Sequence, residues 1–199
     1  MTAENLYVVK RTIFNPNTPF EPSFDVALPA TFTDLRAAKI EAENTLVKEG
    51  YEARFFSVYD VNDGSKEWKH GDGVIVYAKG PSQELLKVEI DTVPNLLRLG
   101  SGADGRIEPP LHHVLQTIIE YDNDRSGTQR YSIIEGTYTN PTVAREQALG
   151  ALLGNGTKKE DFVQYDEFTD GDAPFGSDVV VHAVKEGGQN VLVAVISDR

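Results

Sequence analysis

The sequence predicts an α+β protein made by tandem duplication of one ββαβββ unit, in which a mainly antiparallel sheet carries one packed helix. Three observations lead to this fold class. The C-terminal half repeats the N-terminal half, each half has one helix signal among strand signals, and a Gly-rich segment separates the halves. We expect the first unit at 1–95, a Gly/Pro linker at 96–110 and the second unit at 111–199. One helix covers only one sheet face, so we also expect the copies to pack around a pseudo-twofold axis, as in an isologous dimer.

The internal repeat runs through a whole half of the chain at a shift of 105 or 106 positions. The clearest matches are Thr31–Asp34 with Thr137–Asn140, Tyr59–Asp60 with Tyr165–Asp166, and Val74–Ala78 with Val179–Ala183. Chance can produce a few identities, but chance matches do not keep an almost constant shift through both the helix and the strand signals. Between the copies, Leu99–Arg106 is rich in glycine and Pro109–Pro110 closes the segment, which is the composition of a linker.

Each copy is expected to begin with two strands that form a hairpin. Their content of β-branched residues predicts strands at Leu6–Phe14 and Phe24–Pro29 in the first copy, and at Leu111–Ile119 and Tyr131–Glu135 in the second. The second strand of each pair carries the weaker signal.

A helix follows the hairpin in each copy. Asp34 and Asn140 are good N-cap residues, and Pro141 suits the first helical position. From Leu35 to Leu46, apolar residues recur at steps of three and four, which predicts one buried stripe. We expect Gly50 and Gly156 to end the two helices at the C′ position.

Three more strands complete each copy. We expect them at about 53–60, 73–79 and 85–91, and again at 160–166, 178–184 and 190–196. Lys79–Ser82 and Lys185–Gly188 have the composition of hairpin turns between the last two strands of each copy.

Composition excludes several classes of function. The chain has 199 residues, a net charge of −12 and no cysteine, which removes disulfides, thiol catalysis and zinc–thiolate sites. The basic residues are scattered, so we expect no binding to nucleic acid or to an anionic membrane surface. No apolar run is long enough for a spanning helix, and the N-terminus lacks the pattern of a signal peptide. The simplest location is therefore the cytoplasm.

We expect no metal and no cofactor. Asp122–Gly127 opens like a calcium loop, but Ile133 stands where the bidentate Glu belongs, so turn chemistry is the better interpretation. The acidic segment Asp170–Asp172 is more typical of a solvated loop than of a cation site. His112 and His113 are adjacent on a predicted strand and point to opposite faces, so they cannot readily share a metal.

Four residues are weak candidates for acid–base chemistry: His182, Tyr77, Asp60 and Asp166. His182 stands in the second copy where Tyr77 stands in the first, and an imidazole there can act as acid or base. Asp60 and Asp166 each follow a tyrosine at the end of a predicted strand. For the two aspartates a structural role is the stronger interpretation, because the Tyr-Asp pair recurs in both copies. For His182 the stronger interpretation is a packed, hydrogen-bonded ring that fills the space of an aromatic residue.

Trp68 and Phe175 are the better functional candidates, because each places a large aromatic ring in an irregular loop with glycine neighbours. We therefore expect a non-catalytic intracellular binding protein that uses a groove between the copies or these aromatic loops to bind a protein or a small apolar molecule. The alternative is a cofactor-free enzyme of isomerase, cyclase or lyase type, with its pocket between the copies. The oligomeric state does not follow from the sequence.

Overall fold

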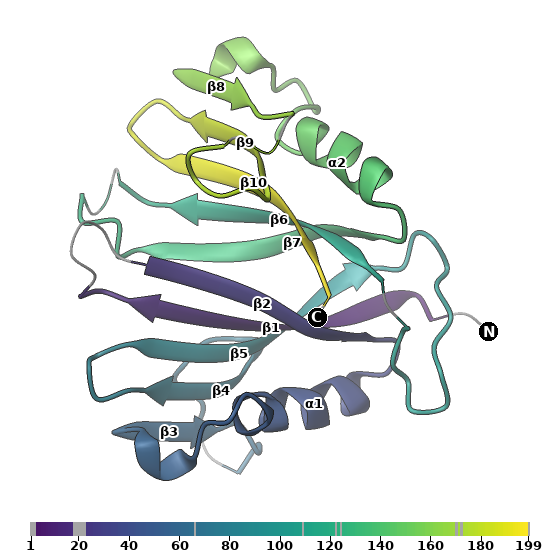
Figure 1. Ribbon diagram of the computed structural model, residues 1–199, viewed down its shortest axis with the longest axis vertical. Coiled ribbons are helices and arrows are strands. Elements are labelled where there is room, and N and C mark those ends of the chain that lie inside the picture. The colour runs from purple at the N-terminus through teal and green to yellow at the C-terminus, as the bar shows by residue number, and fades with distance from the viewer. Residues whose placement is uncertain are drawn as a thin grey trace. The chain divides into compact units, whose positions relative to one another are not determined.

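The computed structural model divides the chain into two compact units, the first reaching Glu108 and the second spanning Pro109–Ser197. The structure describes residues 3–17, 23–65, 67–108, 110–121, 123, 125–169, 171 and 173–198. Each unit holds a five-stranded, fully antiparallel sheet with one α-helix, which confirms the predicted α+β duplication (Figure 1). The pseudo-twofold relation between the copies stays a prediction.

The two units contain the same elements in the same order. In the first, these are β1 (Asn5–Asn15), β2 (Ser23–Phe32), α1 (Leu35–Lys48), a three-ten helix (Ala53–Phe55), β3 (Val58–Val61), β4 (Val74–Lys79) and β5 (Leu85–Pro94). In the second, they are β6 (His112–Ile119), β7 (Arg130–Tyr138), α2 (Pro141–Gly150), a three-ten helix (Lys159–Asp161), β8 (Gln164–Glu167), β9 (Val179–Val184) and β10 (Asn190–Ser197). The strand orders β2-β1-β5-β4-β3 and β7-β6-β10-β9-β8 are therefore equivalent.

The repeat extends to the irregularities of the sheets. In the first unit, the pairing of β4 with β5 skips Ile75, and in the second the pairing of β9 with β10 skips Val180. These two residues lie at the same position of the repeat. An extra residue in one strand bends it and increases its twist, so both sheets bend at the same place.

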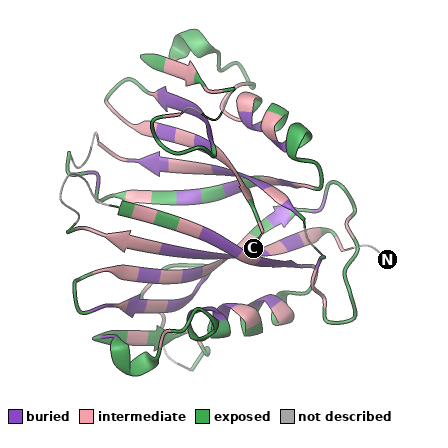
Figure 2. Cartoon of the chain, viewed as in Figure 1, coloured by how far each residue is buried: buried purple, intermediate pink, exposed green. Residues whose placement is uncertain are grey.

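Small residues let each helix lie close to its sheet. Ala38 and Ala42 of α1 are fully buried in one cluster with Val9 and Val88, and α1 packs across β1, β5, β2 and β4. In α2, Ala144 and Ala148 hold the equivalent positions and are also fully buried. Buried positions lie mainly on the inner strands of each sheet, whereas the short end strands β3 and β8 are largely exposed (Figure 2).

The helix caps are formed as the sequence predicts at three of four ends. The Asp34 side chain accepts from the Ala37 N–H at 2.7 Å, and Asn140 Oδ1 accepts from two N–H groups of the first turn of α2. Gly50 has a φ of +92° just after α1. The expectation for Gly156 is wrong: α2 ends at Gly150, and Gly156 lies in a later turn. Gly150 and Gly154 weaken the helix there, because glycine has a low helix propensity.

The strands expected at 53–60 and 160–166 are also shorter than predicted. In both units a three-ten helix takes the first part of this stretch, and only four residues, Val58–Val61 and Gln164–Glu167, are strand. The second hairpin strands are instead longer than expected. β2 reaches Phe32 and β7 reaches Tyr138, because each pairs with its neighbour along nearly its whole length.

The segment expected as a linker is packed against the first unit up to Glu108. The Ile107 N–H donates to the Thr31 carbonyl at 2.9 Å, and the Thr33 N–H donates to the Gly105 carbonyl at 2.8 Å. Ile107 itself is buried. Gly105 has a φ of +79°, and a Cβ there would lie 3.0 Å from the Asp34 Cβ, so this close approach to α1 requires glycine.

Neither helix of the described chain has the length and apolar character needed to cross a membrane.

Replacing Asp34 by alanine should lower the free energy of unfolding of the first unit by about 1 kcal/mol, because the N–H groups of the first turn of α1 lose their acceptor. Denaturant titration followed by the fluorescence of Trp68, the single tryptophan, measures this change. The matched control is Asp34→Asn, which keeps an oxygen acceptor and should remain near the wild type. Equal losses in the two variants would contradict the capping role.

Candidate functional site

The candidate residues of each unit lie across two neighbouring strands. Asp60 of β3 pairs with Tyr77 of β4, and Asp166 of β8 pairs with His182 of β9. The residue before each aspartate is a tyrosine that packs on the helix side of the sheet, as Tyr59 does with the core of the first unit. Because side chains alternate along a strand, the aspartates and their partners share the opposite face.

In the first unit, four side chains form one group, here called the first cluster: Asp60, Trp68, His70 and Tyr77. The His70 Nε2 lies 2.8 Å from Asp60 Oδ2. The His70 ring stacks on Tyr77, with centroids 3.9 Å apart and planes 7° apart, and Trp68 meets it edge-on at 4.8 Å. Trp68 Nε1 donates to the Gly71 carbonyl at 3.0 Å. The structure thus joins Asp60, Tyr77 and Trp68 through a histidine.

In the second unit, the equivalent group is the second cluster: Asp166, Phe168, Phe175 and His182. The ring of Phe175 lies 4.5 Å from that of His182 and meets Phe168 edge-on at 6.4 Å. His182 Nδ1 lies 3.6 Å from Asp166 Oδ2, which is too long for a hydrogen bond. The other ring nitrogen, Nε2, lies 2.8 Å from Asn190 Oδ1.

The two clusters contain the same kinds of side chain at exchanged positions. His70 and Phe175 hold the same place in the repeat, and so do Tyr77 and His182. The imidazole lies in the loop in the first unit and on the strand in the second. The aromatic ring lies on the strand in the first unit, as Tyr77, and in the loop in the second, as Phe175. His70 is not among the site residues predicted from the sequence. Extending the register of Val74–Ala78 and Val179–Ala183 backwards by a few residues would have set it opposite Phe175.

These side chains differ in their exposure to solvent. The side chains of Asp60 and Asp166 are 50% and 44% exposed, and Phe175 is 49% exposed. His182 is only 8% exposed, whereas His70 is 21% exposed. Each unit therefore presents an accessible carboxylate beside rings, and the second unit also buries its imidazole.

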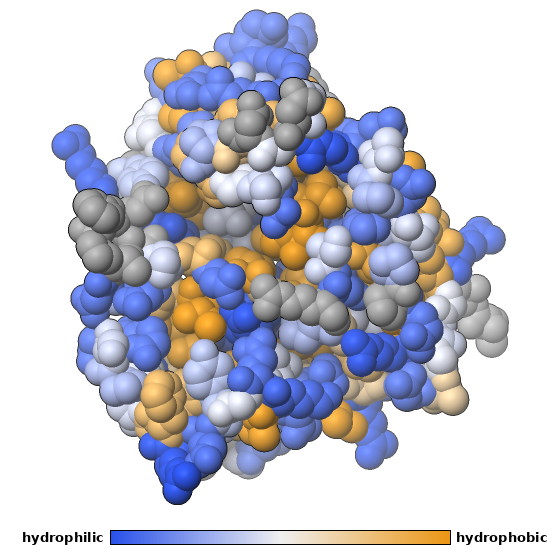
Figure 3. Space-filling view, viewed as in Figure 1, coloured by the Kyte–Doolittle hydropathy of each residue, from blue (hydrophilic) through white to orange (hydrophobic). Residues whose placement is uncertain are grey.

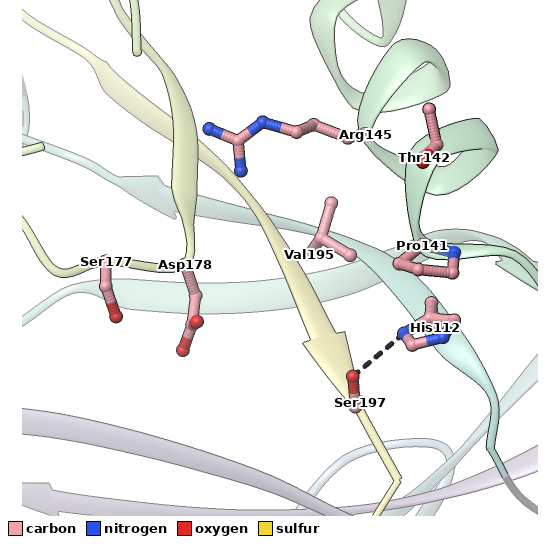
Figure 4. Close-up of a pocket in the computed structure, with 8 residues that line it drawn as sticks. All are labelled: His112, Pro141, Thr142, Arg145, Ser177, Asp178, Val195 and Ser197. Atoms are coloured by element: carbon pink, nitrogen blue, oxygen red, sulfur yellow. Dashed lines mark hydrogen bonds between the residues drawn. The ribbon is translucent and has the colours of Figure 1, made fainter. Parts of the chain in front are cut away.

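A separate pocket of about 340 Å³ lies in the second unit, between the start of α2 and β10 (Figure 4). Its lining includes His112, Thr142, Arg145, Asp178, Val195 and Ser197. The His112 Nδ1 lies 2.9 Å from the Ser197 hydroxyl, and Arg145 donates to the Phe168 carbonyl at 2.7 Å. This pocket is lined by His112 and not by His182. In the first unit Tyr7 stands at the position of His112 and packs against the core.

The metal alternatives gain no support. Asp122, Asp124, Asp170 and Asp172 lie outside the described residues. Within the described ranges, no group of three or more His, Asp or Glu side chains is placed to hold a metal ion. His113 is fully buried and lies 2.9 Å from the Thr137 hydroxyl.

Replacing His70 by alanine should move the fluorescence emission of Trp68 to longer wavelength, because the indole loses the ring that it meets edge-on and gains contact with water. His112→Ala, in the other unit, is the control and should leave the emission unchanged. An unchanged emission in His70→Ala would contradict the first cluster as described.

Stability should fall as the pH rises above 10. Burial raises the pKa of Tyr59, Tyr138 and Tyr165 above 10.0, with a further contribution from Glu167 at Tyr165. The tyrosines of the unfolded chain therefore release their protons at a lower pH than those of the folded chain. The stabilisation present below pH 10 is lost as the pH rises through the pKa values of the folded state. Denaturation midpoints across this range measure the loss, and Tyr59→Phe with Tyr165→Phe should make it smaller. A midpoint that stays constant across this range would contradict the expectation.

No protein-family model matches this chain, and comparisons with curated proteins and with solved structures give no significant match. The function has to be argued from the geometry of the two clusters.

Proposed function

We propose that this is a non-catalytic binding protein whose partner contacts the aromatic loops, through Trp68 in the first cluster and Phe175 in the second. The observation that carries this proposal is that both units gather a carboxylate, an imidazole and an aromatic ring at the same edge of the sheet, although the positions of two of them are exchanged. Both units therefore have the same three kinds of group, although the imidazole and the aromatic ring stand at different positions of the repeat.

The groups are suited to an interface because they are accessible and held in place. Phe175 is half exposed, and its ring contacts those of His182 and Phe168. Ordered aromatic side chains bury a large area at a small entropic cost, which is why they dominate binding energy at interfaces. A carboxylate beside such a ring also favours a cationic group on the partner.

The surface charge favours a basic partner. The net charge is −12, so association with a basic protein or peptide is accelerated by long-range attraction. Hydrophilic side chains cover most of the face in view in Figure 3, and apolar ones form separate patches. We therefore propose a protein or peptide that combines an apolar anchor with basic residues.

The second candidate is the cofactor-free enzyme of isomerase, cyclase or lyase type. One observation favours it: Asp60 Oδ2 lies 2.8 Å from His70 Nε2, which is the arrangement that orients an imidazole for proton transfer. Turnover of a small substrate that falls in Asp60→Asn while binding persists would support this candidate. Binding has the stronger case, because Tyr77 covers one face of the His70 ring and Trp68 meets its edge, which restricts the access of a substrate to the imidazole.

Peptides selected from a displayed random library against the full chain should be enriched in basic and aromatic residues, and Phe175→Ala should weaken their binding about tenfold or more. Trp68 fluorescence and calorimetry measure the affinity. The matched control is Phe55→Ala, which removes a ring that is 46% exposed and outside both clusters. Selected peptides that bind Phe175→Ala and Trp68→Phe as tightly as the wild type would overturn the proposal.

A further inference from the structure

In the second cluster, the hydrogen bonds of Asn190 determine where His182 carries its proton. Asn190 Nδ2 donates to the Gly188 carbonyl at 2.9 Å, so the side-chain oxygen is the atom that faces His182 Nε2 at 2.8 Å. An amide oxygen only accepts, and Nε2 must therefore be the donor. In the neutral imidazole, Nδ1 is then left with a lone pair.

That lone pair faces another acceptor. His182 is 92% buried, and its Nδ1 has no hydrogen-bond partner within the part of the chain that the structure describes. The charged group facing it is the Asp166 carboxylate, whose Oδ2 lies 3.6 Å away. Two acceptors without a shared proton repel each other, and a buried acceptor without a donor is costly. The pair therefore favours a group that brings N–H donors to both atoms.

The first unit shows how an equivalent carboxylate is satisfied. There His70 supplies a ring N–H to Asp60 while its plane lies on the ring of Tyr77. In the second unit Phe175 stands at the position of His70 and has no donor. Asp166 Oδ2 accepts from Gln164 Nε2 of the same strand instead, and a carboxylate oxygen can accept a second hydrogen bond.

We propose that the second cluster binds a guanidinium group, with one N–H on Asp166 Oδ2, a second N–H on His182 Nδ1 and the flat face against Phe175. The two acceptors are somewhat farther apart than the oxygens of one carboxylate, and two neighbouring N–H groups of a guanidinium can reach one each. A guanidinium also stacks on aromatic rings better than an ammonium does. This inference rests on the proposed function, since it makes the Phe175 loop a binding surface.

Binding requires a small movement of Phe175. Its ring lies 4.5 Å from His182 and covers the imidazole, so it must tilt outward to admit the ligand. Because Phe175 is already half exposed, the tilted ring can close over the guanidinium. The guanidinium can belong to an arginine of a partner protein or to a small free compound.

The test is a titration of the full chain, with ¹⁵N-labelled histidine, by methylguanidinium, N-acetyl-arginine amide and a Gly-Arg-Gly peptide. We expect a saturable shift of the His182 Nδ1 resonance, assigned with His182→Gln, and unchanged resonances of His70. N-acetyl-lysine amide should bind about tenfold more weakly. Tighter binding of the peptide than of methylguanidinium identifies an arginine of a protein as the source, and the reverse order identifies a small compound.

Two matched variants locate the site. Asp166→Asn keeps the shape of the side chain and should weaken the arginine probes about tenfold, because a hydrogen bond to a charged group is lost. The control Glu135→Gln removes one carboxylate from an exposed position of β7 in the same unit, outside both clusters, and should have no effect. Circular dichroism confirms that both variants are folded.

Four results would overturn the guanidinium site. These are a proton already on His182 Nδ1 in the free protein, no shift with any arginine probe, equal binding by Asp166→Asn, or a stoichiometric shift with Zn²⁺ in place of the arginine probes. If selected peptides still bind in a Phe175-dependent manner, only this inference fails and the proposed function remains. If the arginine probes bind but no peptide depends on Phe175 or Trp68, the proposed function fails instead.

Discussion

The close contact between each helix and its sheet is the constraint on which the arrangement of both units depends. Ala38 and Ala42 in α1, and Ala144 and Ala148 in α2, are fully buried and place only a methyl group each against the strands. Each helix therefore covers one face of its sheet over four strands: α1 over β1, β5, β2 and β4, and α2 over β6, β10, β7 and β9. Alternation along the strands then directs Asp60 and Asp166 to the opposite face, away from the helix. The candidate groups thus lie on the face of each sheet that its helix does not cover.

Much of the fold could be predicted from the sequence, because its signals are local. The caps at Asp34 and Asn140, the turn glycine Gly50 and the alternating apolar strands act within a few residues, and the repeat supplies each signal twice. The errors arose where tertiary contacts or competing propensities decide. α2, for example, stops at Gly150, well before Gly156.

The candidate sites could be predicted only in part, since a cluster depends on residues that the chain brings together through pairing. Asp60 and Tyr77 are 17 positions apart and meet across two strands, which the repeat alone does not show. His70 is hard to predict because it matches a phenylalanine in the other copy and lies in an irregular loop. The separation of His182 from Asp166 and its contact with Asn190 depend on side-chain conformations, about which sequence spacing says nothing.

The exchange of imidazole and ring between the two units limits the mutational paths that connect them. Changing one residue at a time from the arrangement of His70 and Tyr77 to that of Phe175 and His182 passes through a unit with two imidazoles or through one with none. Among the carboxylate, the imidazole and the ring, only the aspartate stays at one position in both units and in either single-substitution arrangement between them. The carboxylate is thus the member that the two units share, and the imidazole beside it comes from the loop in the first unit and from the strand in the second.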